Sequence, residues 1–180
     1  MLSKVTARRM NIFYLSHKPS RCARWHCDKH VVKMILETTQ LLYTAHWFLE
    51  GTPDFGTAPF RKYVAERGYR SIKNKNHPCA IWVRESLEHY MWLCMFGAYL
   101  CEEYRYRFGP QKRHSCEEHL YWLAANWPPS IPLVGWRQPP QAMPEEYKKS
   151  NSIAAYRAYY LGPKKNLLTY TRRSKPHWIN

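Results

Sequence analysis

The sequence predicts a mainly α-helical protein, and three observations indicate this fold class. Apolar residues recur at steps of three and four over long runs, which is the period of an amphipathic helix. Alternating patterns typical of strands are scarce, and the sequence contains no internal repeat. A chain of 180 residues suits one domain with a sizeable core. We therefore expect a compact single-domain helical fold with a short extended N-terminal segment and a proline-rich surface connection.

Three regions are predicted along the chain. Residues 1–9 are basic and without a clear pattern, so they form either an N-terminal extension or a stretch that is made only when synthesis starts before Met10. Residues 10–162 form the predicted helical domain, which opens with an extended segment at Asn11–Leu15. Residues 163–180 form a tail in which basic and aromatic side chains are mixed.

The predicted helices follow from runs of apolar periodicity that end at glycine and proline. The second long run stops at Gly109-Pro110, because glycine favours the left-handed end of a helix and proline lacks a backbone N–H. Six prolines between positions 128 and 144 predict an irregular surface connection. The predicted helices span about residues 25–49, 80–108, 115–126 and 145–161.

The start of the first long helix holds the residues most suited to chemistry. From Trp25 to Glu37 the chain contains two histidines, two lysines, one cysteine and two carboxylates. At 100° per residue the helix divides into a polar arc and a wide apolar face that would be core. The polar arc contains His26, Lys29, His30, Lys33, Glu37, Gln40 and Thr44, and the apolar face contains Val31, Val32, Met34, Ile35, Leu36, Leu42 and Tyr43.

Asp28 is the exception to this division, because it falls on the apolar side in the first turn. A carboxylate there would be desolvated unless it caps the helix or meets a base. One interpretation is an N-cap aspartate beneath a solvated polar stripe. The other is a catalytic carboxylate for general acid–base work, or for stabilising a cation that forms on a sugar ring. Lys29 or Lys33 would form a Schiff base only with a lowered pKa, so contact with phosphate is the favoured role for both.

The charge of the chain favours a polyanionic partner. Twenty-eight Lys and Arg residues against thirteen Asp and Glu residues give a formal net charge of +15. Aromatic residues make up 16% of the sequence, and aromatics beside basic residues suit stacking on bases next to phosphate contacts. The alternative is an aromatic core beneath a basic surface. A basic loop with Arg70, Lys73 and Lys75 and the tail with Arg172 and Arg173 are predicted to contact nucleic acid.

Several other kinds of site are not favoured. Cys22, His26, Cys27 and His30 invite a zinc site, but no second cluster has the spacing of zinc ligands. Glycine-rich phosphate loops, dinucleotide fingerprints and serine elbows are also missing from the sequence. We therefore predict no metal and no cofactor.

The sequence also bears on location. No apolar stretch of about 18 residues is present, so no membrane association is expected. The first ten residues lack the apolar segment of a secretory signal. We expect an intracellular protein, in the host cytoplasm if it is viral, with its six cysteines reduced.

Four short motifs resemble one known family. They are the Asn-Ile-Phe-Tyr-Leu segment, the His26-Cys27-Asp28 helix entry, the Asn76-His77-Pro78 turn before a long helix, and the ending Tyr159-Tyr160-Leu161-Gly162. In this order they resemble the phage endonuclease V type of pyrimidine-dimer DNA glycosylase, and they are also similar to uncharacterised proteins of bacteriophages and large DNA viruses.

The resemblance implies a chemistry as well as a fold. Members of this family are compact helical proteins that cut the glycosidic bond of a damaged pyrimidine and nick the abasic site, using the terminal α-amine as nucleophile. Asp28 matches the carboxylate that stabilises the charged intermediates, with aspartate where the family usually has glutamate. The family's phosphate-binding cations correspond to the region of Arg21, Arg24 and Lys29, and His77 matches the histidine of the turn. The nine residues before Met10 depart from this pattern, because they displace the α-amine.

We therefore predict a monomeric viral enzyme that binds DNA, most simply double-stranded DNA, and cleaves the N-glycosidic bond of a damaged or modified pyrimidine. Asp28 would be catalytic, and His26, His30 and His77 would position substrate or relay protons. Arg21, Arg24, Lys29, Lys33 and the residues of the basic loop and tail would bind DNA. The alternatives are a non-enzymatic viral nucleic-acid-binding protein, an enzyme acting on free nucleotides or nucleosides, and a zinc protein.

Overall fold

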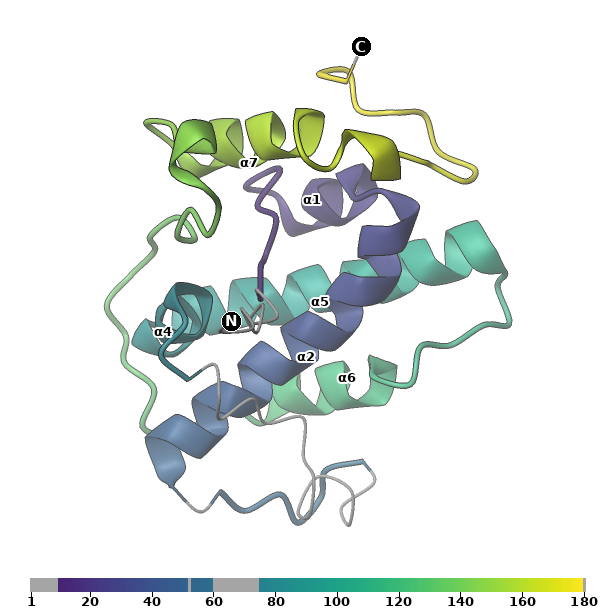
Figure 1. Ribbon diagram of the computed structural model, residues 1–180. Helices are drawn as coiled ribbons and strands as arrows, with labels where there is room; N and C mark the ends of the chain where they lie inside the picture. Colours follow the sequence, from purple (N-terminus) through teal and green to yellow (C-terminus); the bar gives the residue numbers. More distant parts are fainter. Residues whose placement is uncertain (1–9, 52, 60–74, 180) are drawn as a thin grey trace, which may run out of the picture.

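A computed structural model describes residues 10–51, 53–59 and 75–179 of the protein (Figure 1). Its central element is the helix α5, Leu87–Phe108, which contacts four other helices. Within the described ranges there are helices and irregular segments but no strand, so the predicted mainly α fold is confirmed. The helices around α5 are α1, Pro19–Trp25; α2, Asp28–Glu50; α4, Pro78–Glu85; and α6, Glu117–Ala125.

The N-terminal segment is part of the core. Residues 11–15 are all buried and non-helical, and the side chain of Asn11 accepts hydrogen bonds from the backbone N–H groups of Ile12 and Phe13. Phe13 has a φ of +51°, and its ring stacks on His30 with a centroid distance of 4.3 Å. The extended segment therefore contributes to the packing beneath α2 without joining a sheet.

The helix predicted from about Trp25 begins at Asp28, and a separate short helix precedes it. The separate helix α1 was not predicted, and it ends at Trp25 because His26 and Cys27 adopt extended backbone angles. Proline at the first position of α1 favours a helix start there, since its missing N–H would have no helical partner. The long helix α2 then begins at Asp28.

The buried face of α2 is rotated about the helix axis relative to the apolar face predicted from the sequence. His30 and Thr44 were placed on the solvent side but are buried, with 4% and 3% of their surface exposed. Val32 and Leu36 were placed in the core but are 39% and 38% exposed. The physical reason is that remote aromatic residues cover His30, which shifts the buried face around the helix axis.

The predicted helix over residues 80–108 is broken at Ser86. This residue has φ −154° and ψ 143°, and it separates α4 from α5. The next N–H, that of Leu87, donates to the carbonyl of Pro132 at 2.8 Å, so the distant proline-rich connection supplies the partner that a continuous helix would have used. The periodicity of the apolar residues could not reveal this break.

The last helix is shorter than predicted. A 3₁₀ turn, η2, covers Glu145–Tyr147, and the helix α7 covers Ser152–Leu161. Asn151 caps α7, because its side chain accepts a hydrogen bond from the N–H of Ala154 at 2.9 Å. Between α6 and η2 the chain is irregular, as predicted for residues 128–144.

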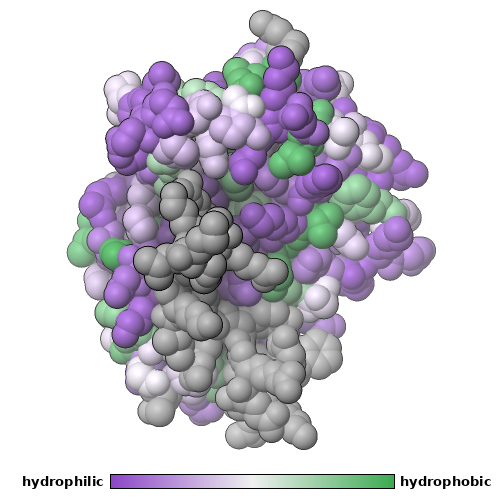
Figure 2. Space-filling view, viewed as in Figure 1, coloured by the Kyte–Doolittle hydropathy of each residue, from purple (hydrophilic) through white to green (hydrophobic). Residues whose placement is uncertain are grey.

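The C-terminal tail lies along α1 and the beginning of α2 (Figure 1). A short 3₁₀ turn, η3, covers Lys165–Leu167, and Tyr170 then donates a hydrogen bond to the carbonyl of Trp25. In Figure 2 hydrophilic residues cover most of the described part of the face in view, with hydrophobic residues in separate patches. None of the helices described is long and apolar enough to cross a membrane. The division into residues 1–9, 10–162 and 163–180 stays a prediction.

Candidate nucleic-acid interface

Arg107, near the end of α5, joins α5 to the junction between α1 and α2. Its guanidinium is fully buried. It donates to the carbonyls of Arg24 at 2.8 Å and His26 at 2.7 Å, which are free because a helix leaves its last carbonyls without helical partners. It also donates to Glu103 at 3.0 Å and to Asp28 at 3.1 Å. One arginine therefore fixes the turn at which the predicted site begins.

The carboxylate of Asp28 is occupied on both oxygens. Besides Arg107, the backbone N–H of Thr171 donates to both oxygens at 3.0 Å, and the Thr171 hydroxyl donates to Oδ2 at 2.8 Å. Cys27 is the N-cap of α2, so Asp28 is the first helical residue and holds the tail instead of capping the helix. The N-cap interpretation is therefore wrong, and a catalytic role for Asp28 stays a prediction.

Glu103 extends this arrangement toward the tail. Arg173 contacts it with two parallel hydrogen bonds, Nε to Oε2 at 3.1 Å and Nη2 to Oε1 at 2.7 Å. The result is a network of alternating charge in the order Asp28, Arg107, Glu103, Arg173. Because every member is paired, the network leaves no isolated buried charge.

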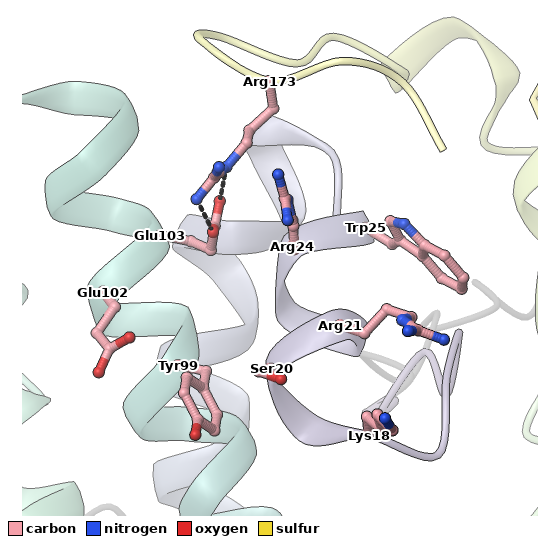
Figure 3. A pocket seen from close by; sticks show the side chains of 9 residues that line it. All are labelled: Lys18, Ser20, Arg21, Arg24, Trp25, Tyr99, Glu102, Glu103 and Arg173. Carbon is pink, nitrogen blue, oxygen red and sulfur yellow. Dashed lines mark hydrogen bonds and ion pairs between the residues drawn. The ribbon is translucent and has the colours of Figure 1, made fainter. Parts of the chain in front are cut away.

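A cavity of about 530 Å³ opens beside this network, between α1, α5 and the tail (Figure 3). Arg24 lies next to the Arg173–Glu103 pair, and Arg21 and Lys18 lie farther along α1 (Figure 3). The four cations of the cavity thus come from two segments that are remote in sequence. The residues lining it are Lys18, Ser20, Arg21, Arg24, Trp25, Tyr99, Glu102, Glu103 and Arg173.

The cavity combines groups that recognise phosphate with an aromatic wall. Guanidinium groups bind phosphate oxygens through paired N–H donors, which suits Arg21 and Arg24 because both are exposed. The indole of Trp25 is half-buried, and the guanidinium of Arg157 lies 4.9 Å from its ring centroid. Such an arrangement can hold the backbone of a nucleic acid at α1.

His26 and His30 lie in the core rather than on the surface of this cavity. Burial lowers the pKa of His26 to about 4, although its Nδ1 contacts the carbonyl of Cys22 at 2.7 Å. Burial also lowers the pKa of His30 to about 2, and its Nδ1 contacts the Tyr160 hydroxyl at 2.6 Å. Both rings are therefore neutral at pH 7. Their predicted role in positioning substrate or relaying protons has no support from this placement and stays a prediction.

Glu37, two turns along α2 from His30 and on the same side of the helix, forms a second carboxylate centre. Its Oε2 accepts a hydrogen bond from the backbone N–H of Asn11 at 3.2 Å, and its Oε1 pairs with Lys33 at 3.0 Å. Helix α4 packs against α2, and burial, followed by the negative charge of Glu37, raises the pKa of the Cys79 thiol to about 12. His77 caps α4 by accepting a hydrogen bond from the N–H of Cys79.

A family model describing pyrimidine dimer DNA glycosylases matches residues 10–117. The chain belongs to this family. No curated protein and no solved structure matches the chain. Membership supports DNA glycosylase function in general, with DNA as the bound substrate, and it confirms the family predicted from the four motifs.

The matched residues of this glycosylase include most of the charge network around Arg107 and the contacts of Glu37. Asn11, Glu37, His77 and Arg107 lie within the match, together with α1, α2, α4 and α5. Thr171 and Arg173, which complete the network at the cavity, lie outside it. The cavity at α1 is therefore built jointly by the matched part and by the tail.

The predicted DNA-binding residues are divided among several places. Arg21, Arg24 and Arg173 meet in the cavity, whereas Lys29 and Lys33 are exposed on α2. Arg172 is exposed and donates to the carbonyl of Tyr106 at 3.4 Å, outside the cavity. Lys75 is exposed before α4. Arg70 and Lys73 lie outside the described residues.

The residues of the cavity and its network that sequence reasoning missed include Arg107, Glu103, Lys18, Trp25 and Tyr99. Arg107 and Glu103 lie four residues apart near the end of α5, and a charged pair at this spacing on an apolar helix was the available signal. The other three, Lys18, Trp25 and Tyr99, carry no signal in the sequence that marks them as lining a cavity. Among the described residues no group of three or more His, Cys, Asp or Glu side chains is placed to hold a metal ion. All six cysteines are buried and free.

Proposed function

We propose that this glycosylase removes a damaged or modified pyrimidine from double-stranded DNA, and that it holds a DNA phosphate in the cavity at α1. The observation that carries the proposal is the convergence of Lys18, Arg21, Arg24 and Arg173 on one cavity in a member of a DNA glycosylase family. Phosphate contacts fix the register of a protein on a duplex. Lys29 and Lys33 extend the basic surface along α2.

Two carboxylates are candidates for stabilising the positive charge that forms on the sugar. Asp28 is the residue that the sequence predicts, but it acts on substrate only if Thr171 moves away. Glu37 contacts a backbone nitrogen at the first residues of the matched segment. We infer that Glu37 is the better placed of the two, because it lies beside the backbone N–H of Asn11 at the start of the matched segment, whereas Asp28 is held by Thr171 of the tail.

The abasic-site step implied by the family resemblance requires an amine. Its nitrogen forms a bond to C1′ as the electrons of the glycosidic bond leave with the base, and opening of the sugar ring then gives an imine. A chain started at Met10 would carry its α-amine one residue before Asn11, whose N–H lies 3.2 Å from Glu37. This neighbourhood supports an amine nucleophile beside a carboxylate.

The test is borohydride trapping on ultraviolet-irradiated and untreated DNA duplexes, with chains starting at Met1 and at Met10. Borohydride reduces an imine to a stable covalent adduct. An adduct specific to irradiated DNA that forms only with the Met10 chain would establish the terminal amine. Released base without an adduct would identify a glycosylase that uses water and overturn the amine step.

The occupied state of Asp28 favours one further candidate, a DNA-binding protein without catalytic activity. If Asp28 is only a structural anchor, the cavity would bind phosphate with no chemistry following. This protein would show tight, steeply salt-dependent binding and no product with any damaged duplex. Glu37→Gln compared with Glu118→Gln, an exposed residue of α6, distinguishes the two functions. Loss of base release in the Glu37 variant alone would exclude the non-catalytic function.

A further inference from the structure

A second cavity, of about 470 Å³, lies where α2 ends, away from α1 (Figure 1). It is formed by the last turns of α2, the segment after it, and the end of α6. No lysine or arginine belongs to the described residues that line it, although the whole chain carries a net charge of +15. The lining residues are His46, Glu50, Asp54, Gly56, Thr57, Trp122, Ala125, Asn126, Trp127 and Pro129.

Its two carboxylates are each fixed by one oxygen. Glu50 Oε1 lies 2.7 Å from Nδ1 of His46, and Asp54 Oδ1 accepts the backbone N–H of Gly56 at 2.8 Å. The second oxygens, Glu50 Oε2 and Asp54 Oδ2, accept no hydrogen bond from the described residues. Two oriented carboxylates therefore present unused acceptors in one cavity.

His46 connects one of these carboxylates to the core. Its side chain is almost fully buried, and burial lowers the pKa of His46 while the adjacent Glu50 opposes that shift. The other ring nitrogen, Nε2, lies 3.0 Å from the Tyr90 hydroxyl. The Tyr90 hydroxyl in turn donates a hydrogen bond to the carbonyl of Leu123 at 3.1 Å. Glu50 and Asp54 are the acidic side chains among the described residues that line the cavity.

Two tryptophans supply aromatic surface beside these carboxylates. The Trp122 indole is held by a hydrogen bond from Nε1 to the Thr57 hydroxyl at 2.9 Å, and its ring is nearly parallel to that of Tyr43. Trp127 is 45% exposed. Indole faces attract organic cations, and the attraction is strongest for tryptophan among the aromatic residues.

We propose that this cavity binds a small organic cation, of the class of aliphatic primary diamines. An ammonium group donates hydrogen bonds to the two free carboxylate oxygens, and the aliphatic carbons lie against the indoles. A DNA phosphate would instead be repelled by Glu50 and Asp54, so the cavity is separate from the phosphate cavity at α1. The proposal does not depend on the glycosylase function.

The experiment is isothermal titration calorimetry of the full chain with 1,4-diaminobutane, and with the uncharged 1,4-butanediol as comparison. Asp54→Asn removes one charge and keeps an oxygen for the Gly56 N–H, so the segment keeps its conformation. We expect saturable binding of the diamine, no binding of the diol, and about a tenfold higher Kd for the diamine in Asp54→Asn. Glu118→Gln, an exposed acid outside the cavity, should leave the Kd unchanged.

Three results would overturn the proposal. They are the absence of diamine binding, equal binding of the diol, and an unchanged Kd in Asp54→Asn. Saturable binding of deoxycytidine without binding of the diamine would assign the cavity to a nucleobase and overturn it as well. Base release from damaged duplex is measured on the same preparations. Activity with no diamine binding would contradict only the cation site, and diamine binding without activity would contradict only the glycosylase function.

Discussion

The two ends of α2 carry cavities of opposite character. At the α1 end, cations predominate in the cavity, and the nearby carboxylates of Asp28 and Glu103 are already paired with Arg107, Arg173 and Thr171. At the far end, two carboxylates keep free oxygens and the described lining contains no lysine or arginine. The net charge of +15 predicts the first cavity but not the second. What a site can bind depends on which charges remain unpaired locally.

The largest loss of unfolding free energy should come from replacing Arg107, because its buried guanidinium holds the α1 end together through four contacts. Arg107→Ala leaves Asp28 and Glu103 without their shared cation and frees the carbonyls of Arg24 and His26. Removing one partner of a buried charge network costs about 3–5 kcal/mol of unfolding free energy. Urea unfolding measures it, and Arg172→Ala, an exposed tail arginine, is the control. A loss below 1 kcal/mol would mean that the network does not hold this end together.

Acid should destabilise the packing around His26 and His30 at the α1 end. His26 and His30 have folded-state pKa values lowered to about 4 and about 2, so below the ordinary value of about 6.5 the unfolded chain binds more protons. Stability is therefore complete above that value and falls as the pH drops. Between pH 7 and pH 5 we expect a loss of about 2 kcal/mol per histidine.

The measurement is urea unfolding at pH 7, 6 and 5. His30→Gln should reduce the slope with pH, whereas His177→Gln, an exposed tail residue, should keep it. His46 at the far end should contribute less, because Glu50 opposes the effect of burial on its pKa. An identical slope in His30→Gln and the unaltered chain would contradict this prediction.

Asp28→Asn should separate structure from catalysis at the α1 end. The amide keeps one acceptor for Thr171 but no longer neutralises Arg107, so we expect a loss of about 1–3 kcal/mol in unfolding free energy. Base release per folded molecule should then be compared with that of Glu37→Gln. If activity per folded molecule is unchanged in Asp28→Asn, the residue is an anchor for the tail. If turnover is lost with DNA affinity intact, Asp28 is catalytic.

The smallest effect should be on DNA affinity when one cavity cation is removed. Arg24→Ala removes one phosphate contact, so the slope of log K against log salt should fall by about 1, with weaker binding to every duplex sequence. Arg137→Ala is the matched control, because Arg137 is exposed, pairs with Glu85 and lies outside the cavity. Equal slopes in the two variants would contradict the proposal that this cavity binds a DNA phosphate.

Sequence periodicity predicted the fold class and the approximate positions of α2, α5 and α6, because these helices bury wide apolar faces. It could not place the break at Ser86 or the burial of His30. Both depend on partners far along the chain, namely Pro132 for the N–H of Leu87, and Phe13 and Tyr160 for the histidine ring.

The same limit applies to the candidate site. Arg21, Arg24 and Arg173 were each predicted to bind DNA, and their charge and family resemblance sufficed for that. That Arg173 would pair with Glu103, and Asp28 with Thr171, depends on how the tail folds back. The importance of Glu37 likewise depends on its contact with Asn11, which is 26 positions away.

The contact between Asp28 and Thr171 also has a consequence for how the protein is made. The two residues are 143 positions apart, so the segment that completes the phosphate cavity is synthesised long after α1 and α2. Contacts of such long sequence separation form late, because the entropy of loop closure opposes them until other structure is in place. A ribosome-bound chain that has not reached Arg173 lacks one of the cations that line the cavity, so the growing chain should bind DNA weakly until Arg173 has been added.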